Sequence, residues 1–192
     1  MKLTLTILLL CFLSVIHAAD STKINAGSNL KLGVGYAPGF ITENTLTSQL
    51  HANLGYEING LSVRFDTYYF LDSKGDRPRF TFNHQFYLGS FYRFGSKKLH
   101  PSIGAQIGLA YAQSNENGVF NAVTGIIDYK PAINPVALVS LGIEYDFTKQ
   151  LYTFFEGKYI SGKHVSNSYP TYLDELRISI GIGFNLINKT TN

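Results

Sequence analysis

The sequence predicts an all-β protein, an eight-stranded antiparallel up-and-down transmembrane β-barrel with short periplasmic turns and long extracellular loops. Three observations indicate this fold. Apolar and polar residues alternate with a period of two in eight segments, as they do in strands with two unlike faces. Several segments run 11 to 15 residues, against about 5–6 in ordinary sheets. The connections alternate between short and long, which is typical of bacterial outer-membrane barrels.

Composition excludes several classes of protein. The chain has 192 residues, which is enough for one domain at most. Its charged fraction is 15%, well below the roughly 25% of ordinary soluble domains. It carries 13 Tyr and 14 Phe, whereas disordered chains are poor in aromatics and rich in charge. The net charge is +3 with scattered Lys and Arg, so we expect no nucleic-acid partner.

The first 19 residues read as a secretory signal peptide. Lys2 supplies the positive start, Leu3–Ile16 form the apolar stretch, and small residues allow cleavage near Ala19. A retained membrane anchor is the alternative, but the apolar run is shorter than the roughly 20 residues that span a bilayer. Cys11 leaves with this segment, so we expect no disulfide and no cysteine-ligated metal. The predicted parts are residues 1–19 (signal peptide), 20–28 (a short segment), 29–188 (the barrel) and 189–192 (a tail).

The eight alternating segments define the predicted strands. They are Asn29–Tyr36, Gln49–Ile58, Leu61–Leu71, Phe80–Phe94, Leu99–Ala112, Ile133–Phe147, Leu151–Gly162 and Glu175–Ile187. The short connections are Asn59-Gly60, which is the dipeptide of a type I′ hairpin, Gly95–Lys98 and Thr148–Gln150. The predicted long loops are Ala37–Ser48, Asp72–Arg79, Gln113–Ala132 and Lys163–Asp174.

Aromatic residues gather at both ends of the apolar face. Those near the short turns are Tyr56, Tyr92, Phe94, Tyr145, Phe147 and Phe184, and those near the long loops are Tyr36, Tyr69, Phe80, Tyr111 and Tyr159. Two such girdles are expected where a barrel crosses the two membrane interfaces. A soluble sandwich or a lipocalin-like barrel, the competing folds, has no reason to place them so. With the signal peptide, this pattern predicts the outer membrane of a Gram-negative bacterium.

The inward face carries charges of both signs. They are Lys31, Glu57, Arg64, Asp66, Arg93, Glu144, Asp146, Glu156, Lys158, Glu175 and Arg177. Eight strands enclose only enough space for side chains, and a buried charge without a partner costs several kcal/mol. We therefore expect a plug of paired charges. A narrow channel or a proton relay is the alternative.

Two further features of the inward face lead to expectations about packing. Nine glycines share it, and we expect them to make room for the long Arg and Lys side chains. They are Gly33, Gly35, Gly55, Gly89, Gly104, Gly108, Gly142, Gly181 and Gly183. Val136 and Leu138 also fall on this face. They indicate either a bulge in the sixth predicted strand or that its upper part belongs to the long loop.

A strand–turn–strand stretch carries a resemblance to a known family. It runs Gly142-Ile-Glu-Tyr-Asp-Phe-Thr-Lys-Gln-Leu151 and continues as Phe155-Glu156-Gly-Lys-Tyr-Ile-Ser-Gly162. It resembles the small outer-membrane β-barrel superfamily, the group around the OmpX/Ail, Opa and OmpA transmembrane domains. The resemblance implies an eight-stranded barrel. It does not decide between the roles found in that group, which include adhesins, invasins, serum-resistance factors and envelope scaffolds.

The run His164-Val-Ser166-Asn167 resembles the lipid A 3-O-deacylase family, which is also built on an eight-stranded barrel. The resemblance implies His164 as base, Ser166 as nucleophile and Asn167 as oxyanion donor, with Glu175 in the place of a further acidic residue. The run lies beyond the predicted end of the seventh strand, and its phase points inward. We therefore expect a polar loop and no catalysis, with a lipid A-modifying enzyme as the alternative.

Metal and cofactor sites have no signature in this sequence. No His pair has helical ligand spacing, and no Gly-rich phosphate loop follows a strand into a helix. We expect no metal and no cofactor.

The third long loop is the candidate for binding a partner. It contains Phe120, Ile126, Ile127 and Tyr129, and exposed apolar clusters often mark interaction sites. The competing interpretations are a loop folded onto its own apolar residues, or strands that continue beyond the membrane. We expect a monomeric surface protein that contacts outer-membrane lipid and lipopolysaccharide. Its role would be structural, or the binding of an extracellular or envelope protein through these loops.

Overall fold

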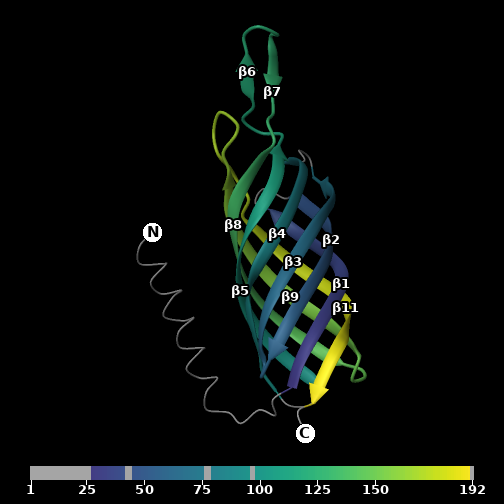
Figure 1. The fold of residues 1–192 in the computed structure, drawn as a ribbon. Coiled ribbons are helices and arrows are strands. Elements are labelled where there is room, and N and C mark those ends of the chain that lie inside the picture. The colour runs from purple at the N-terminus through teal and green to yellow at the C-terminus, as the bar shows by residue number, and fades with distance from the viewer. Residues whose placement is uncertain (1–26, 42–44, 76–78, 96–97, 191–192) are drawn as a thin grey trace.

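The computed structural model describes residues 27–41, 45–75, 79–95 and 98–190. The predicted signal peptide and Cys11 lie outside the described residues. Eight long strands of this part of the chain form a closed antiparallel barrel, which confirms the predicted fold (Figure 1). They are β1 (Gly27–Ile41), β2 (Thr45–Ile58), β3 (Leu61–Lys74), β4 (Phe80–Arg93), β5 (Leu99–Ser114), β8 (Ala132–Asp146), β9 (Leu151–His164) and β11 (Glu175–Thr190).

Each barrel strand pairs with its neighbours along the chain, and β1 closes the barrel against β11. Closure leaves no sheet edge within the membrane, where an unpaired backbone group would cost several kcal/mol. Two short strands, β6 (Val119–Asn121) and β7 (Ile126–Asp128), form a sheet of their own, and a third, β10 (Thr171–Tyr172), pairs with the upper end of β9. No helix in the described residues has the length and apolar character that a membrane crossing requires.

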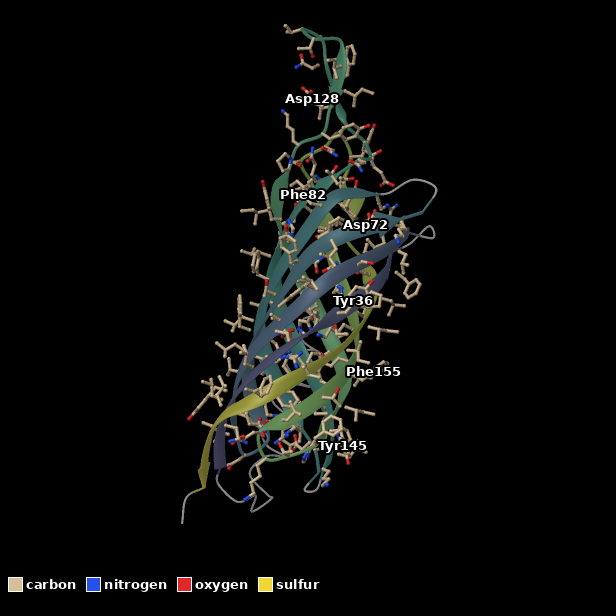
Figure 2. The ribbon with its side chains drawn as sticks, turned by 90° about the vertical axis from the view of Figure 1, so that its right-hand side faces the viewer. Tyr36, Asp72, Phe82, Asp128, Tyr145 and Phe155 are labelled. Atoms are coloured by element: carbon tan, nitrogen blue, oxygen red, sulfur yellow. The ribbon has the colours of Figure 1, made fainter. Side chains whose placement is uncertain are left out.

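The side-chain alternation follows the predicted faces. Along β2, buried and less buried residues alternate from Thr45 to Ile58, as the pleat of a strand requires. The type I′ turn is confirmed, because Asn59 and Gly60 both have positive φ, at 52° and 81°. Outward-facing apolar side chains cover the wall, among them Tyr36, Phe155 and Tyr145 at successive heights (Figure 2).

The prediction of a long loop over Ala37–Ser48 is wrong. Ala37 pairs with Gln49 and Ile41 with Thr45, so β1 and β2 continue through most of it. The alternation also continues there, since Ile41 is buried and Phe40 is exposed. Pro38, which has no N–H to donate, lies where the pairing of β1 with β11 is interrupted. The proline therefore does not end the strand.

The prediction that Phe80 belongs to the outer aromatic girdle is also wrong. Its side chain points into the barrel and is 2% exposed. The pairing of β4 with β5 shifts register between Phe80 and Phe82, and one extra residue in a strand reverses the phase of everything beyond it.

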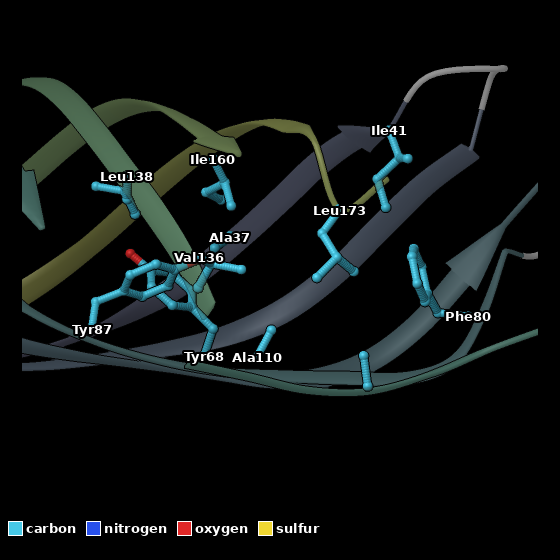
Figure 3. Packing of buried hydrophobic residues seen from close by; sticks show 11 residues of the cluster. Ala37, Ile41, Tyr68, Phe80, Tyr87, Ala110, Val136, Leu138, Ile160 and Leu173 are labelled. Carbon is cyan, nitrogen blue, oxygen red and sulfur yellow. The ribbon is translucent and has the colours of Figure 1, made fainter. Parts of the chain in front are cut away.

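The upper interior contains an apolar cluster beside buried charged residues such as Glu175 and Arg177. Tyr68, Tyr87, Val136, Leu138 and Ile160 belong to a buried cluster that reaches the long-loop end (Figure 3). Its other members are Ala37, Ile41, Phe80, Ala110, Ala112 and Leu173. The pairing of β8 with β5 is regular from Ala132 to Tyr145, so the bulge expected at Val136 and Leu138 is absent from this ladder. These two residues belong to an apolar cluster at the level of Glu175, which pairs with Ile160.

Candidate functional site

The interior charges lie in three groups along the barrel. Near the short turns, Lys31 Nζ contacts Glu57 at 2.9 Å and Glu144 at 2.7 Å. Arg93 contacts the same two carboxylates, at 2.7 Å and 3.4 Å. Asp146 lies 3.0 Å from His100 and 3.8 Å from Arg93. Two cations therefore share two carboxylates, and the cluster is close to neutral.

The middle group is deeply buried. Arg64 donates to Asp66 at 2.8 Å and also binds Glu156 through both terminal nitrogens. Lys158 lies 2.6 Å from Glu156 and donates to the hydroxyl of Tyr68. These five polar side chains thus form one network, which is connected by short hydrogen bonds and ion pairs.

The third group lies nearer the long loops. Arg177 donates to Glu175 at 2.6 Å and to Gln85 at 3.0 Å. Thr47 also donates to Glu175, at 2.7 Å. With this group, each of the eleven charged residues predicted to face inward has an opposite charge within 4 Å. A void of about 20 Å³ between Lys31, Arg64 and Tyr152 has room for about one water molecule, and this is far too little for a pore at that level.

Aromatic rings fill the space beside four of the nine inward glycines, Gly104, Gly108, Gly181 and Gly183. A Cβ at Gly104 would lie 2.4 Å from the ring of Phe91, and one at Gly183 would lie 2.2 Å from the ring of Tyr152. Arg64 stacks on Phe91, with its guanidinium carbon 3.5 Å from the ring centroid. The expectation that the glycines accommodate Arg and Lys holds only in part, since only a few, such as Gly55, face a charged side chain directly.

The third loop is a β-hairpin that stands above the barrel wall. In the hairpin, β6 pairs with β7 through Val119–Asp128, Phe120–Ile127 and Asn121–Ile126. Figures 1 and 2 show it rising clear of the strands, roughly along the barrel axis. Its apolar side chains are open to solvent, with exposed fractions of 65% at Phe120, 61% at Ile126 and 95% at Val123. The competing interpretation, a loop folded onto its own apolar residues, does not describe this segment.

The base of the hairpin is held by the fourth loop. The Asn167 side chain donates to the carbonyls of Ser114 and Glu116 and accepts from the backbone N–H of Lys130. Ser168 donates to the carbonyl of Asn117 through its backbone N–H and to that of Gly118 through its hydroxyl. Asn167 is 8% exposed. These bonds connect both stems of the hairpin to one loop.

The third loop is also held from the other side. Arg79 donates to Glu116 at 2.9 Å, and the backbone N–H of Asn115 donates to the carbonyl of Arg79. The hairpin is thus a supported element on a rigid scaffold, where functional residues are often found. Of the residues predicted to bind a partner, Phe120, Ile126 and Ile127 lie on the hairpin, and Tyr129 directly follows β7. Sequence reasoning did not select Val123, whose place before Thr124-Gly125 marks the turn.

Two members of the deacylase-like quartet, His164 and Ser166, are brought together. Ser166 Oγ lies 2.8 Å from His164 Nε2, which is the distance of a nucleophile and its base. The other two members are engaged elsewhere. Asn167 supports the hairpin, and Glu175 binds Arg177 and Thr47.

The hydrogen bonds around His164 decide which ring nitrogen carries the proton. Asn134 accepts from the backbone N–H of Val165 and donates to the carbonyl of Ala132, so its amide orientation is set. Its Nδ2 then donates to His164 Nδ1 at 3.1 Å, which places the imidazole proton on Nε2. That N–H donates to Ser166, whose hydroxyl donates to the carbonyl of Lys130. Sequence reasoning gave no signal for Asn134, which is 30 residues away.

No cluster of three or more His, Cys, Asp or Glu side chains suited to holding a metal occurs among the residues that the structure describes. The interior carboxylates are instead bound to the Arg and Lys side chains named above.

Comparison with known proteins gives a fold and no function. No family model matches the chain, and no curated protein matches it. Among solved structures, it is similar to Neisserial surface protein A, with a TM-score of 0.56, 16% identity and coverage of 83% of this chain and 97% of that one. The fold is that of the small eight-stranded outer-membrane β-barrels.

The N-terminal β-barrel domain of Pseudomonas aeruginosa OprF is similar at a TM-score of 0.52, with 13% identity and coverage of 81% and 97% of the two chains. The predicted fold is confirmed by these likenesses, and the exposed apolar wall is the kind of surface that barrels of this architecture turn to lipid. At such identities the likeness carries no information on ligand or partner.

Proposed function

We propose that this barrel is a non-enzymatic surface protein that binds a partner outside the cell through the hairpin β6–β7. The observation that carries the proposal is an exposed apolar hairpin that is held at its base by two other loops. Exposed apolar surface is costly unless something covers it, and hydrogen bonds at the stems keep it away from the barrel.

The interior supports a scaffold role and not transport. Its charges are paired among themselves, and an apolar cluster fills space beside the upper charges. The barrel then serves to hold the hairpin at a constant height and orientation. The second candidate function is a purely structural role in the envelope. That role predicts that no partner binds the hairpin.

The test is chemical crosslinking on intact cells followed by pull-down. The informative variant replaces Val119–Asp128 with Asn-Gly, which removes the apolar tip and keeps the stems that Asn167 and Ser168 hold. We expect the wild-type protein to capture a partner and the variant to lose it. Both should keep the heat-dependent gel shift of a folded barrel. Equal capture by a folded variant would reject binding through the hairpin.

Catalysis by Ser166 is tested separately. A nucleophilic Ser must pass its proton to the base, whereas here Ser166 accepts from His164 and donates to a carbonyl. We expect overexpression of the wild-type protein and of Ser166→Ala to leave the lipid A mass spectrum unchanged. Loss of one acyl chain with the wild type, but not with Ser166→Ala, would favour the lipid A-modifying alternative.

A further inference from the structure

Both faces of the hairpin tip carry apolar side chains, and one of them also carries Asn121 and Asp128. Phe120 and Ile127 form a cross-strand pair on one face. Ile126 lies on the opposite face beside Asn121, and Val123 is at the turn. A protein partner would cover one face and leave the others in water. A lipid bilayer would surround all of them.

The end of the hairpin nearest its turn carries no charge. The segment from Asn117 to Ile127 contains no Asp, Glu, Lys or Arg. Of the nearest charged residues, Glu116 binds Arg79 at the base of the hairpin, and Asp128, at the end of β7, accepts from Asn121. The tip is therefore not suited to recognising an acidic or basic partner, because electrostatic complementarity needs charge on both surfaces.

Its polar groups are largely satisfied within the hairpin. Asn121 accepts from the backbone N–H of Val123 at 3.0 Å and donates to Asp128 at 3.1 Å. Its carbonyl accepts from the N–H of Gly125 at 2.8 Å. Internal hydrogen bonding is what lets a backbone segment leave water for lipid.

The direction of the hairpin identifies which membrane it can meet. It rises away from the barrel wall (Figures 1 and 2), so its turn is held off the membrane that contains the barrel. Three residues per strand at about 3.3 Å each give a tip of about 10 Å. This length matches the roughly 5–10 Å to which interfacial segments bury their apolar face.

We propose that the tip of β6–β7 inserts into the interfacial layer of a second lipid bilayer facing the cell. This inference rests on the proposed function and names the partner as a membrane surface. Insertion buries Phe120, Val123 and Ile126 and needs no ionic contact. Binding should therefore not depend on anionic lipid and should persist at high salt, where interactions between exposed charges are screened.

The experiment uses the mature protein in nanodiscs mixed with phosphatidylcholine vesicles, and flotation measures the bound fraction. We expect Val123→Asp to weaken binding by about tenfold or more, because a carboxylate is costly in the bilayer. Val165→Asp is the matched control, since Val165 is 63% exposed outside the hairpin, and it should bind as the wild type does. An environment-sensitive dye on Thr124→Cys should shift to the blue when vesicles are added.

The outcomes separate this inference from the proposed function. Binding no stronger than that of empty nanodiscs, or equal binding by Val123→Asp, would overturn membrane insertion. If crosslinking still captured a protein through the hairpin, the proposed function would stand with a protein partner. If neither vesicles nor a protein depended on the hairpin, both proposals would fail.

Discussion

Glu156 is the residue that connects the middle of the barrel interior. It binds Arg64 and Lys158, and it is 1% exposed. A buried charge that loses its partner cannot recover the hydration it gave up on folding. Two cations would be left facing one remaining carboxylate, Asp66, which also lies 2.6 Å from His51.

Glu156→Gln should therefore destabilise the folded barrel by about 3–5 kcal/mol, the usual cost of breaking a buried pair. The measurement is urea-induced unfolding in lipid vesicles, followed by the gel shift of the folded form. Glu116→Gln is the control, because its pair with Arg79 is partly exposed and should be worth less than about 1 kcal/mol. Equal stability of the two variants would contradict the network.

Two glycines on opposite faces of the wall allow a paired test of interior packing. Gly104 faces the ring of Phe91, whereas the nearest atom to a Cβ at Gly157 is 4.0 Å away. Gly104→Ala should cost about 1–3 kcal/mol because the ring must move. Gly157→Ala should be neutral or slightly stabilising, since the unfolded chain loses freedom. The same unfolding assay checks both, and a neutral Gly104→Ala would show that the interior is loosely packed.

Among the elements, the hairpin β6–β7 is stabilised by more than the three residue pairs between its own strands. A two-stranded ribbon is only marginally stable in water by itself. The added bonds come from Asn167 and Ser168 on one side and from Arg79 on the other. The orientation of β6–β7 therefore depends on two other loops.

Asn167→Ala should loosen the hairpin and leave the barrel intact. It removes three hydrogen bonds to the two stems, so amide hydrogen exchange should become faster in residues 115–130. Asn185→Ala is the control, because the Asn185 side chain bonds Lys149 at the short-turn end. Unchanged exchange in the hairpin of Asn167→Ala would show that the fourth loop does not hold it.

At the scale of the whole molecule, the barrel is a closed wall around a filled interior. The described interior contains paired charges, aromatic rings that pack against glycines, and a cluster of buried apolar residues. Each of these removes space that water and ions would need, and eight strands leave little to begin with.

We therefore expect no stable ion conductance. Purified protein in a planar lipid bilayer should give no resolvable single-channel steps at moderate voltage, with a 16-stranded porin as the positive control for insertion. Regular steps that disappear in a heat-denatured sample would contradict the filled interior and favour the narrow channel.

The sequence by itself determined the barrel, its strands, its short turns and the face of nearly every residue. These features are local, because a period of two reports on the pleat within one strand. The Asn59-Gly60 turn and the inward phase of Lys31, Arg64 and Glu156 were readable for this reason. The same rule failed at Phe80, where the extra residue of a bulge shifted the phase.

Only the tertiary structure decided which residues meet. Lys31 and Glu144 are 113 residues apart, and their contact depends on barrel closure and on the register of every pair of strands between them. The supporting role of Asn167, and the proton position that Asn134 sets on His164, follow in the same way from loops that meet above the barrel. Contacts of this kind leave no period in the sequence, because they depend on where separate elements end in space.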